Sequence, residues 1–259
     1  MAKWRRQRQR QLELNLPTWG GRRKGAGRKP RGRKAGVSHR RRPELKTDTV
    51  IHVTLRVRRD VARLRTKERV RVLRRCLVAG CTRPGFRVVY YSVQRLHLHL
   101  IIEADRCDAL ASGMNGLGSS MGRRLNATIA RTGRVFVDRY HAHVLQTPRE
   151  AREALAYVLL NRTRHMAQRG QRIVRPQPDP FSSGALFDGW RESPCVSPAP
   201  PERACVARPH SWLLRVGWRR HGFISVTEVP GPSRQPIASV PPRSGRPPVA
   251  LLARPRHFW

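Results

Sequence analysis

Acidic residues are scarce in this chain. Its 259 residues include 54 Lys and Arg against only 16 Asp and Glu, which gives a formal net charge of +38. Such an excess of positive charge is far beyond what solubility requires, and the charges repel one another in a compact chain. A polyanionic partner would neutralise it, and nucleic acid is the partner that we expect. Most of the cations are arginines, which suit bidentate contacts to phosphate.

Cysteine pairs and long apolar runs are also lacking. The five cysteines are an odd number and contain no C-x-x-C pair, so we expect reduced thiols and neither a zinc knuckle nor a disulfide framework. No apolar run approaches the ~20 residues of a membrane span. The basic start is not followed by the apolar segment of a secretory signal. The sequence therefore predicts a cytoplasmic, nucleoid-associated protein without membrane contact.

The two ends of the chain have biased compositions. Residues 1–46 hold 17 Lys and Arg and two acids, so we expect a disordered basic arm that binds DNA. Its Arg28, Arg31 and Arg33 loosely match an AT-hook, in which arginines enter a narrow minor groove; a generic phosphate-binding arm is the alternative. Residues 171–259 hold 16 of the 21 prolines and are expected to form a Pro-rich extension, partly ordered near 181–229. Within it, residues 212–218 are expected to dock on the core as a short helix or strand.

The central part, residues 47–170, carries the periodic patterns of a folded domain. Alternation over residues 50–57 predicts a half-buried strand, and residues 86–93 and 95–103 predict two strands joined by a very short turn. Helical spacing is found over residues 60–77, 106–129 and 151–165, and residues 135–145 read as a loop that leads into a strand. The resulting βαββαβ order predicts an α+β, ferredoxin-like antiparallel sheet with an added C-terminal helix. The strand of residues 95–103 should be central.

The middle helix contains four glycines, Gly113, Gly116, Gly118 and Gly122. Glycine lowers helix stability but permits a close approach. Close packing on the sheet and approach of a phosphate are both compatible with this pattern.

His97 and His99 lie one residue apart within the expected central strand. Side chains at i and i+2 share a face, so the two imidazoles should project together, with Leu98 on the other side. Two converging imidazoles form most of a metal site if a third ligand comes from elsewhere. The alternative is a pair of ordinary strand histidines.

The last predicted helix has a clear start and two polar residues on one face. Thr147 as N-cap, Pro148 at the first position and Glu150 at N3 form a capping box. Tyr157 and Asn161 follow, four residues apart and so one turn apart. They offer a hydroxyl nucleophile and an amide oxygen, which with two imidazoles could hold Mg²⁺ or Mn²⁺ and activate a phosphodiester. Taken singly, Tyr157 could instead pack at the sheet edge, and Asn161 could face solvent.

Three stretches together resemble a known family. L-H-L-H-L-I-I at residues 96–102 matches the His-hydrophobic-His motif of the HUH endonucleases. With G-R-V-F-V-D-R-Y-H-A-H-V-L at residues 133–145 and A-Y-V-L-L-N at residues 156–161, the chain resembles the single-tyrosine transposases, and more narrowly their REP-associated branch. Arg162 stands where that family's tail motif has a proline.

The resemblance implies a divalent-metal-dependent nuclease and strand transferase that acts on single-stranded DNA near a hairpin. His97 and His99 would ligate Mg²⁺ or Mn²⁺, with Asn161 as third ligand, and Tyr157 would form a 5′-phosphotyrosine link and release a 3′-OH. A second set, assigned to DNA contact or to support of the site, comprises Arg139, Tyr140, His141 and His143.

Two other functions fit part of the pattern. The basic segments alone would suffice for a non-catalytic, domesticated DNA-binding protein, and the charge alone would suit an RNA-binding protein. The sequence is compatible with both a monomer and a homodimer.

Overall fold

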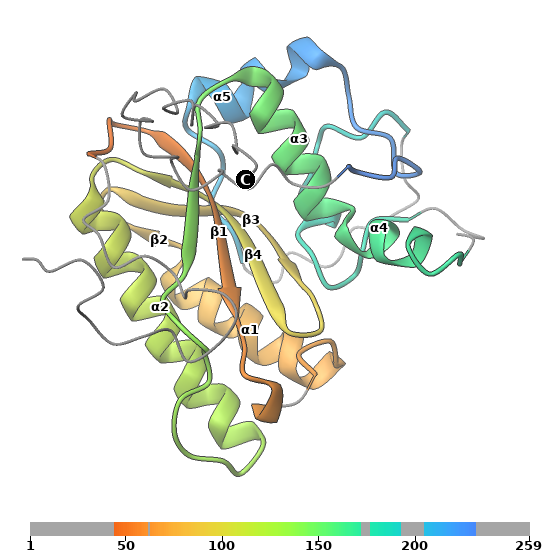
Figure 1. The fold of residues 1–259 in the computed structure, drawn as a ribbon. Coiled ribbons are helices and arrows are strands. Elements are labelled where there is room, and N and C mark those ends of the chain that lie inside the picture. Colours follow the sequence, from red (N-terminus) through yellow and green to blue (C-terminus); the bar gives the residue numbers. More distant parts are fainter. Residues whose placement is uncertain (1–43, 62, 172–176, 193–204, 232–259) are drawn as a thin grey trace, which may run out of the picture. The chain divides into compact units, whose positions relative to one another are not determined.

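The computed structural model describes residues 44–61, 63–171, 177–192 and 205–231. All of them belong to one compact unit of the chain, His39–Trp259. Residues 1–43 of the predicted basic arm, with Arg28, Arg31 and Arg33, lie outside these ranges. The described residues form a single five-stranded antiparallel sheet flanked by helices, which confirms the α+β class (Figure 1). No helix in this part of the chain is long and apolar enough to span a membrane.

The strands follow the order β2-β3-β4-β1-β5 across the sheet. Their bounds are β1 Thr49–Arg56, β2 Thr82–Arg83, β3 Phe86–Val93, β4 His97–Ala104 and β5 His141–Leu145. The strand that begins at His97 is thus central, as expected, and it pairs with β3 on one side and β1 on the other. Strand β2 was not predicted, because two residues are too short to show a period.

One face of the sheet is covered by α1 (Lys67–Gly80) and α2 (Cys107–Thr128). The apolar stripe predicted for α2 is buried there and comprises Leu110, Met114, Leu117, Met121 and Leu125. Gly113 lies against the ring of Phe86 so closely that a Cβ atom would overlap it. Close packing on the sheet therefore explains this glycine.

Helix α1 starts later than the sequence suggested. Arg59–Val61 form a 3₁₀ turn instead of the first turn of a helix that begins near Asp60. The α-helix begins only after Thr66, whose hydroxyl accepts a hydrogen bond from the Arg69 backbone N–H at 3.3 Å. Buried Leu64 holds the intervening segment against the sheet, since its N–H donates to the Arg95 carbonyl at 2.9 Å.

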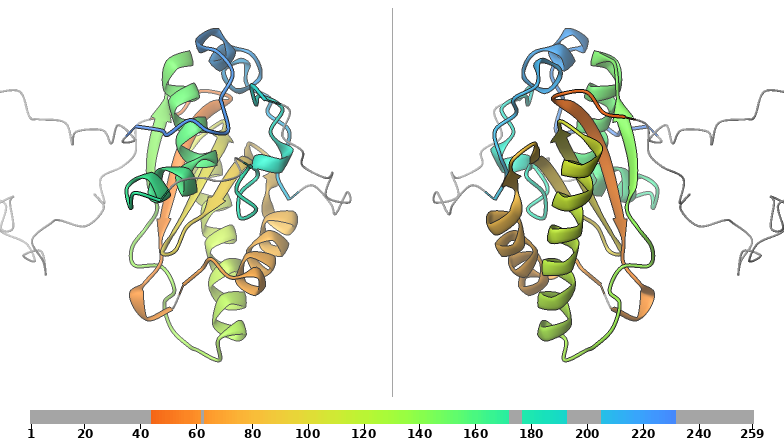
Figure 2. Two further views of the ribbon diagram at one scale, coloured as in Figure 1. Left: turned by 90° about the vertical axis from the view of Figure 1, so that its right-hand side faces the viewer. Right: turned by 90° about the vertical axis from the view of Figure 1, so that its left-hand side faces the viewer.

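The opposite face of the sheet is covered by α3 (Pro148–Leu159) and by part of the Pro-rich extension. Figure 2 shows α3 on one side of the sheet and α1 and α2 on the other. Strand β1 is therefore buried on both faces rather than half-buried: Val50 and His52 are only 2% and 6% exposed. The alternation of β1 identified the core under α1 and α2, but it could not show that a second layer covers the remaining face.

The extension is part of the same core. Its helix α5 (Trp212–Arg215) docks as expected, and Phe187, Leu214, Trp218 and Ile224 pack against α3. Backbone groups of residues 181–183 and 207 also hydrogen-bond to the outer edge of β3. An open strand edge is a template for unwanted pairing, so this contact protects the sheet. The boundaries suggested at residues 46 and 170 stay predictions.

Candidate active site

His97 and His99 lie on the face of β4 that α3 covers. Their ring centroids are 6.2 Å apart with an interplanar angle of 21°. Leu98 and Leu100 point into the opposite core under α1 and α2. The two imidazoles therefore share a face, as the His-Leu-His spacing predicts.

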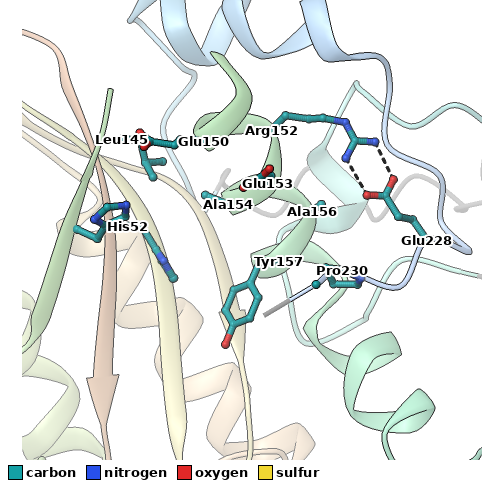
Figure 3. A pocket seen from close by; sticks show the side chains of 12 residues that line it. His52, Leu145, Glu150, Arg152, Glu153, Ala154, Ala156, Tyr157, Glu228 and Pro230 are labelled. Atoms are coloured by element: carbon teal, nitrogen blue, oxygen red, sulfur yellow. Dashed lines mark hydrogen bonds and ion pairs between the residues drawn. The ribbon is translucent and has the colours of Figure 1, made fainter. Parts of the chain in front are cut away.

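Tyr157 comes to this face from α3. Its ring centroid lies 5.3 Å from that of His99, and the two rings meet edge to face at 89°. The tyrosine is partly exposed, and its hydroxyl makes no hydrogen bond with any residue that the structure describes. Figure 3 shows Tyr157 on its helix, with His52 on the neighbouring sheet. The structure thus brings the predicted nucleophile to the predicted histidine pair.

The start of α3 is fixed by the predicted capping box. The Glu150 N–H donates to the Thr147 hydroxyl at 3.2 Å, and the Glu150 carboxylate accepts from the Gln146 N–H at 2.8 Å and the Thr147 N–H at 3.4 Å. Pro148 occupies the first helical turn without loss of a hydrogen bond. A fixed start and a buried Leu155 set the rotation of the helix, and therefore the direction of Tyr157.

The helix does not continue to His165 as predicted. It ends at Leu159, Leu160 has φ −106° and ψ 16°, and a separate helix α4 spans Asn161–Ala167. Val158, Leu159, Leu160 and Asn161 are all at most 1% exposed. Four consecutive residues project around most of a straight helix, whereas a core-facing stripe covers only about 100°. The break at Leu160 allows all four to be buried.

Asn161, the first residue of α4, is buried and has no hydrogen-bond partner in the part of the chain that the structure describes. It is 1% exposed, and neither its Oδ1 nor its Nδ2 atom has a hydrogen-bond partner among the described residues. The alternative of a solvent-facing Asn161 is therefore wrong. An unpartnered amide in the interior costs about 1–3 kcal/mol, and a hard cation is the kind of ligand that an amide oxygen can bind.

His52 is a member of the site that the sequence interpretation missed. Its Nε2 atom lies 3.2 Å from His99 Nδ1, and its ring centroid lies 5.7 Å from that of Tyr157. Burial, and to a lesser extent His143 and His141, lower the pKa of His52 to about 4. The alternation of β1 could have shown that His52 lies on the face opposite Ile51 and Val53. Only the register between β1 and β4 shows that His52 lies beside His99.

The environment of His99 leaves one ring nitrogen available. His99 Nδ1 lies 3.2 Å from both His52 Nε2 and Thr54 Oγ1, so Nε2 is the atom without a described partner. Burial, reinforced by His52 and His97, holds the pKa of His99 well below its usual value. Burial, with Arg56 and His165, also lowers the pKa of His97. Neutral imidazoles keep the lone pair that a metal ion requires.

Arg164 is a second residue that the sequence interpretation did not identify. It lies on α4, and its guanidinium carbon is 5.1 Å from the centroid of the Tyr157 ring. A cation at this distance is attracted to the face of the ring. The helix break brings a positive charge close to the tyrosine.

The side chains that could hold a divalent metal are His97, His99 and Asn161. Within the described ranges, no group of three His, Cys, Asp or Glu could hold a metal ion, so a metal ion on the two histidines would require a third ligand of another type. The buried amide of Asn161, which has no described partner, fits this requirement. A mixed set of nitrogen and oxygen donors suits Mn²⁺ better than a set of imidazoles alone.

The four residues predicted to contact DNA or to support the site do not all lie on one face of the sheet. His141 and His143 on β5 pair directly with Thr54 and His52 on β1, so they lie on the face of the candidate site. Tyr140 is instead buried in the core under α1 and α2, and Arg139 is partly exposed in the preceding loop. DNA contact by these four residues stays a prediction.

No protein-family model and no curated protein matches the sequence. Among solved structures, the chain is similar to a REP-associated tyrosine transposase bound to a REP hairpin, with 19% identity, a TM-score of 0.44, and coverage of 57% of this chain and 82% of that chain. It is also similar to a Deinococcus radiodurans R1 protein whose description assigns it provisionally to the transposases, with 17% identity, a TM-score of 0.32, and coverage of 44% and 86%. The structural similarities of this chain are thus to proteins described as transposases.

Proposed function

We propose that this chain nicks and rejoins single-stranded DNA near hairpins, as a metal-dependent transposase with a 5′-phosphotyrosine intermediate. The observation that carries the proposal is the position of Tyr157 over His99 at the edge of a buried site that also contains His52. The order β3-β4-β1-β5 supports a ferredoxin-like core, since a βαββαβ chain folded in this way has its third and first strands in the middle.

Tyr157 is suited to act as the nucleophile. Its oxygen would attack the scissile phosphorus and form a phosphotyrosine bond, while the bond from phosphorus to the 3′ oxygen breaks and that oxygen takes up a proton as a 3′-OH. The phenol proton would pass to water, because Tyr157 is partly exposed. The covalent bond conserves the phosphodiester energy, so attack by a 3′-OH would reverse the step and join strands.

The neighbouring residues would prepare this step. The Arg164 guanidinium holds the Tyr157 ring by a cation–π contact, and His52 and Thr54 orient the His99 ring through its Nδ1 atom. Such hydrogen bonds to the distal ring nitrogen are typical of metal-binding histidines. His97, His99 and Asn161 would hold Mg²⁺ or Mn²⁺, which when bound would polarise the phosphate and stabilise its developing charge.

The test is the incubation of the protein with a single-stranded oligonucleotide that carries a hairpin, in the presence of Mn²⁺ or Mg²⁺. We expect a covalent protein–DNA adduct that survives denaturation and a free 3′-OH fragment. The Tyr157→Phe variant should form no adduct and should unfold at nearly the same temperature, because the hydroxyl has no described hydrogen bond. Nicking by Tyr157→Phe at the wild-type rate would contradict the assignment of the nucleophile.

A non-catalytic DNA-binding protein is the second candidate, and the large positive charge favours it. The nuclease should form a covalent protein–DNA adduct, whereas a non-catalytic DNA-binding protein should form none. Tight binding of the oligonucleotide without any adduct, in either metal, would support the second candidate.

A further inference from the structure

A strongly basic groove lies next to His97. It has a volume of about 600 Å³ and runs between α4, the turn from β3 to β4, and the segment before α1. Five arginines line it, namely Arg63, Arg65, Arg95, Arg162 and Arg169, together with His97. A smaller hollow lined by Arg59, Arg63, Arg95 and Leu96 adjoins it through shared residues.

None of the described residues that line this groove carries a carboxylate. Of its arginines, Arg65 is neutralised by a bidentate pair with Asp179, at 2.7 and 2.9 Å. The other four, namely Arg63, Arg95, Arg162 and Arg169, are exposed, and their side chains have no hydrogen bond or ion pair with the residues described. Arginines elsewhere in the fold, such as Arg87 and Arg152, do have acidic partners. Four arginines without a described partner therefore line a single groove.

The other hollow at the site has a different character. It is lined by Tyr157 and His52, has a volume of about 350 Å³, and includes Glu150, Glu153 and Glu228 in its wall (Figure 3). Glu228 is paired with Arg152, which lines the same hollow, and Glu153 is paired with Arg149. Among the described residues, this wall therefore offers a phosphodiester backbone no arginine without an acidic partner. A strand that reaches Tyr157 should therefore keep its phosphates on the side of His97.

We propose that the Arg63–Arg95–Arg162–Arg169 groove holds the phosphodiester backbone of the single strand that flanks the scissile phosphate. The proposal rests on the function proposed above and names the surface by which the substrate is held. Guanidinium groups bind phosphate oxygens in a bidentate manner. His165, Leu96 and Met166 in the same groove offer ring and apolar surface against which bases can lie.

Arg162 has a particular place in this surface. It occupies the position where the resembling family's tail motif has a proline, and here it is exposed in the first turn of α4. The chain thus adds a cation directly after the buried Asn161. The groove and the candidate metal site meet at this point of the sequence.

The test compares two triple variants of the full-length protein that remove the same charge. One is Arg95→Ala, Arg162→Ala, Arg169→Ala in the groove. The matched control is Arg75→Ala, Arg123→Ala, Arg124→Ala on α1 and α2, where the arginines are also exposed but lie on the other side of the sheet. The affinity for a labelled oligothymidine is measured by fluorescence anisotropy over a range of salt concentrations.

The groove variant should show a slope of log K against log salt that is smaller by about 2, since each phosphate contact on a single strand contributes about 0.7. We expect affinity to fall on the order of tenfold at 0.1 M salt, with a much smaller loss in the control. Hydrogen exchange of the wild-type protein should show protection of residues 94–96 and 161–169 on addition of the oligonucleotide. Equal slopes for both variants, or protection confined to other residues, would overturn the proposal.

Failure of this proposal is distinguishable from failure of the proposed function. Binding is measured without chemistry, so a smaller slope with no covalent adduct would keep the groove and reject the nuclease. An adduct that forms with wild-type affinity in the groove variant would keep the nuclease and reject the groove. If the groove substitutions weakened the binding of duplex DNA more than the binding of the single strand, the proposal would also be rejected.

Discussion

At the scale of single residues, Asn161 is the most informative side chain of the candidate site. Buried polar groups in native proteins nearly always have a partner, and an exception requires an explanation. Here both amide atoms have none among the described residues. Under the function proposed above, a metal ion held by Asn161 and the two histidines would satisfy the amide oxygen and would explain why this polar residue lies in the interior.

Replacing Asn161 with leucine should separate the energetic cost of burying the amide from its role in binding a metal ion. In the presence of EDTA, we expect the Asn161→Leu variant to be at least as stable as the wild type, because an amide without a partner is removed. Mn²⁺ should raise the stability of the wild type by about 2.7 kcal/mol at a hundred times its dissociation constant, and of the variant much less. Thermal unfolding with and without Mn²⁺ measures both effects.

The matched control is Asn115→Leu, at an exposed position of α2. It should retain the full stabilisation by Mn²⁺. Equal stabilisation of the Asn161→Leu variant and the wild type would show that the amide does not bind the ion.

At the scale of elements, the site depends on two helices whose junction is not a regular turn. Helix α3 presents Tyr157, whereas α4 presents Asn161 and Arg164. Val158 through Asn161 are buried together across this break. The break at Leu160 is followed by α4, which brings Arg164 against the tyrosine ring.

The capping box at the start of α3 should contribute measurably to stability. Removal of the N-cap hydroxyl in Thr147→Ala leaves the Glu150 N–H without its acceptor and should cost about 1 kcal/mol. Urea unfolding measures the loss. The same substitution at exposed Thr132, in the loop before β5, should change the free energy of unfolding by less than about 0.5 kcal/mol. Equal effects of the two substitutions would mean that the cap is not formed in solution.

At the scale of the whole described unit, the Pro-rich extension is fastened to the sheet by charged groups. The carboxylate of Glu103 on β4 is fully buried; it accepts hydrogen bonds from the Arg87 guanidinium at 3.1 Å and from the Ser211 N–H at 2.8 Å. Arg152 on α3 binds Glu228 with two bonds of 2.7 Å. The extension therefore holds α3 against the sheet from outside.

Loss of the charge at Glu103 should loosen this attachment. The Glu103→Gln variant leaves Arg87 without its buried partner, and breaking a buried pair in this way costs about 3–5 kcal/mol. The value here should lie near the lower end, because Arg87 is 21% exposed and also pairs with Asp48. Denaturant unfolding measures the loss, and hydrogen exchange should rise in residues 210–218. Glu44→Gln, at an exposed position, serves as the control and should change neither. Unchanged exchange in Glu103→Gln would contradict the anchoring role.

The sequence by itself determined the order of the main strands and helices, the shared face of His97 and His99, and the capped start of the tyrosine helix. These features depend on local rules: the two-residue period of a strand, the helical repeat of apolar side chains, and the hydrogen bonds of a cap. Only the tertiary structure decided that His52 and Arg164 join Tyr157, that the helix breaks at Leu160, and that Asn161 is buried without a described partner. Those features depend on strand register and on the packing of residues distant in the chain, which no local pattern encodes.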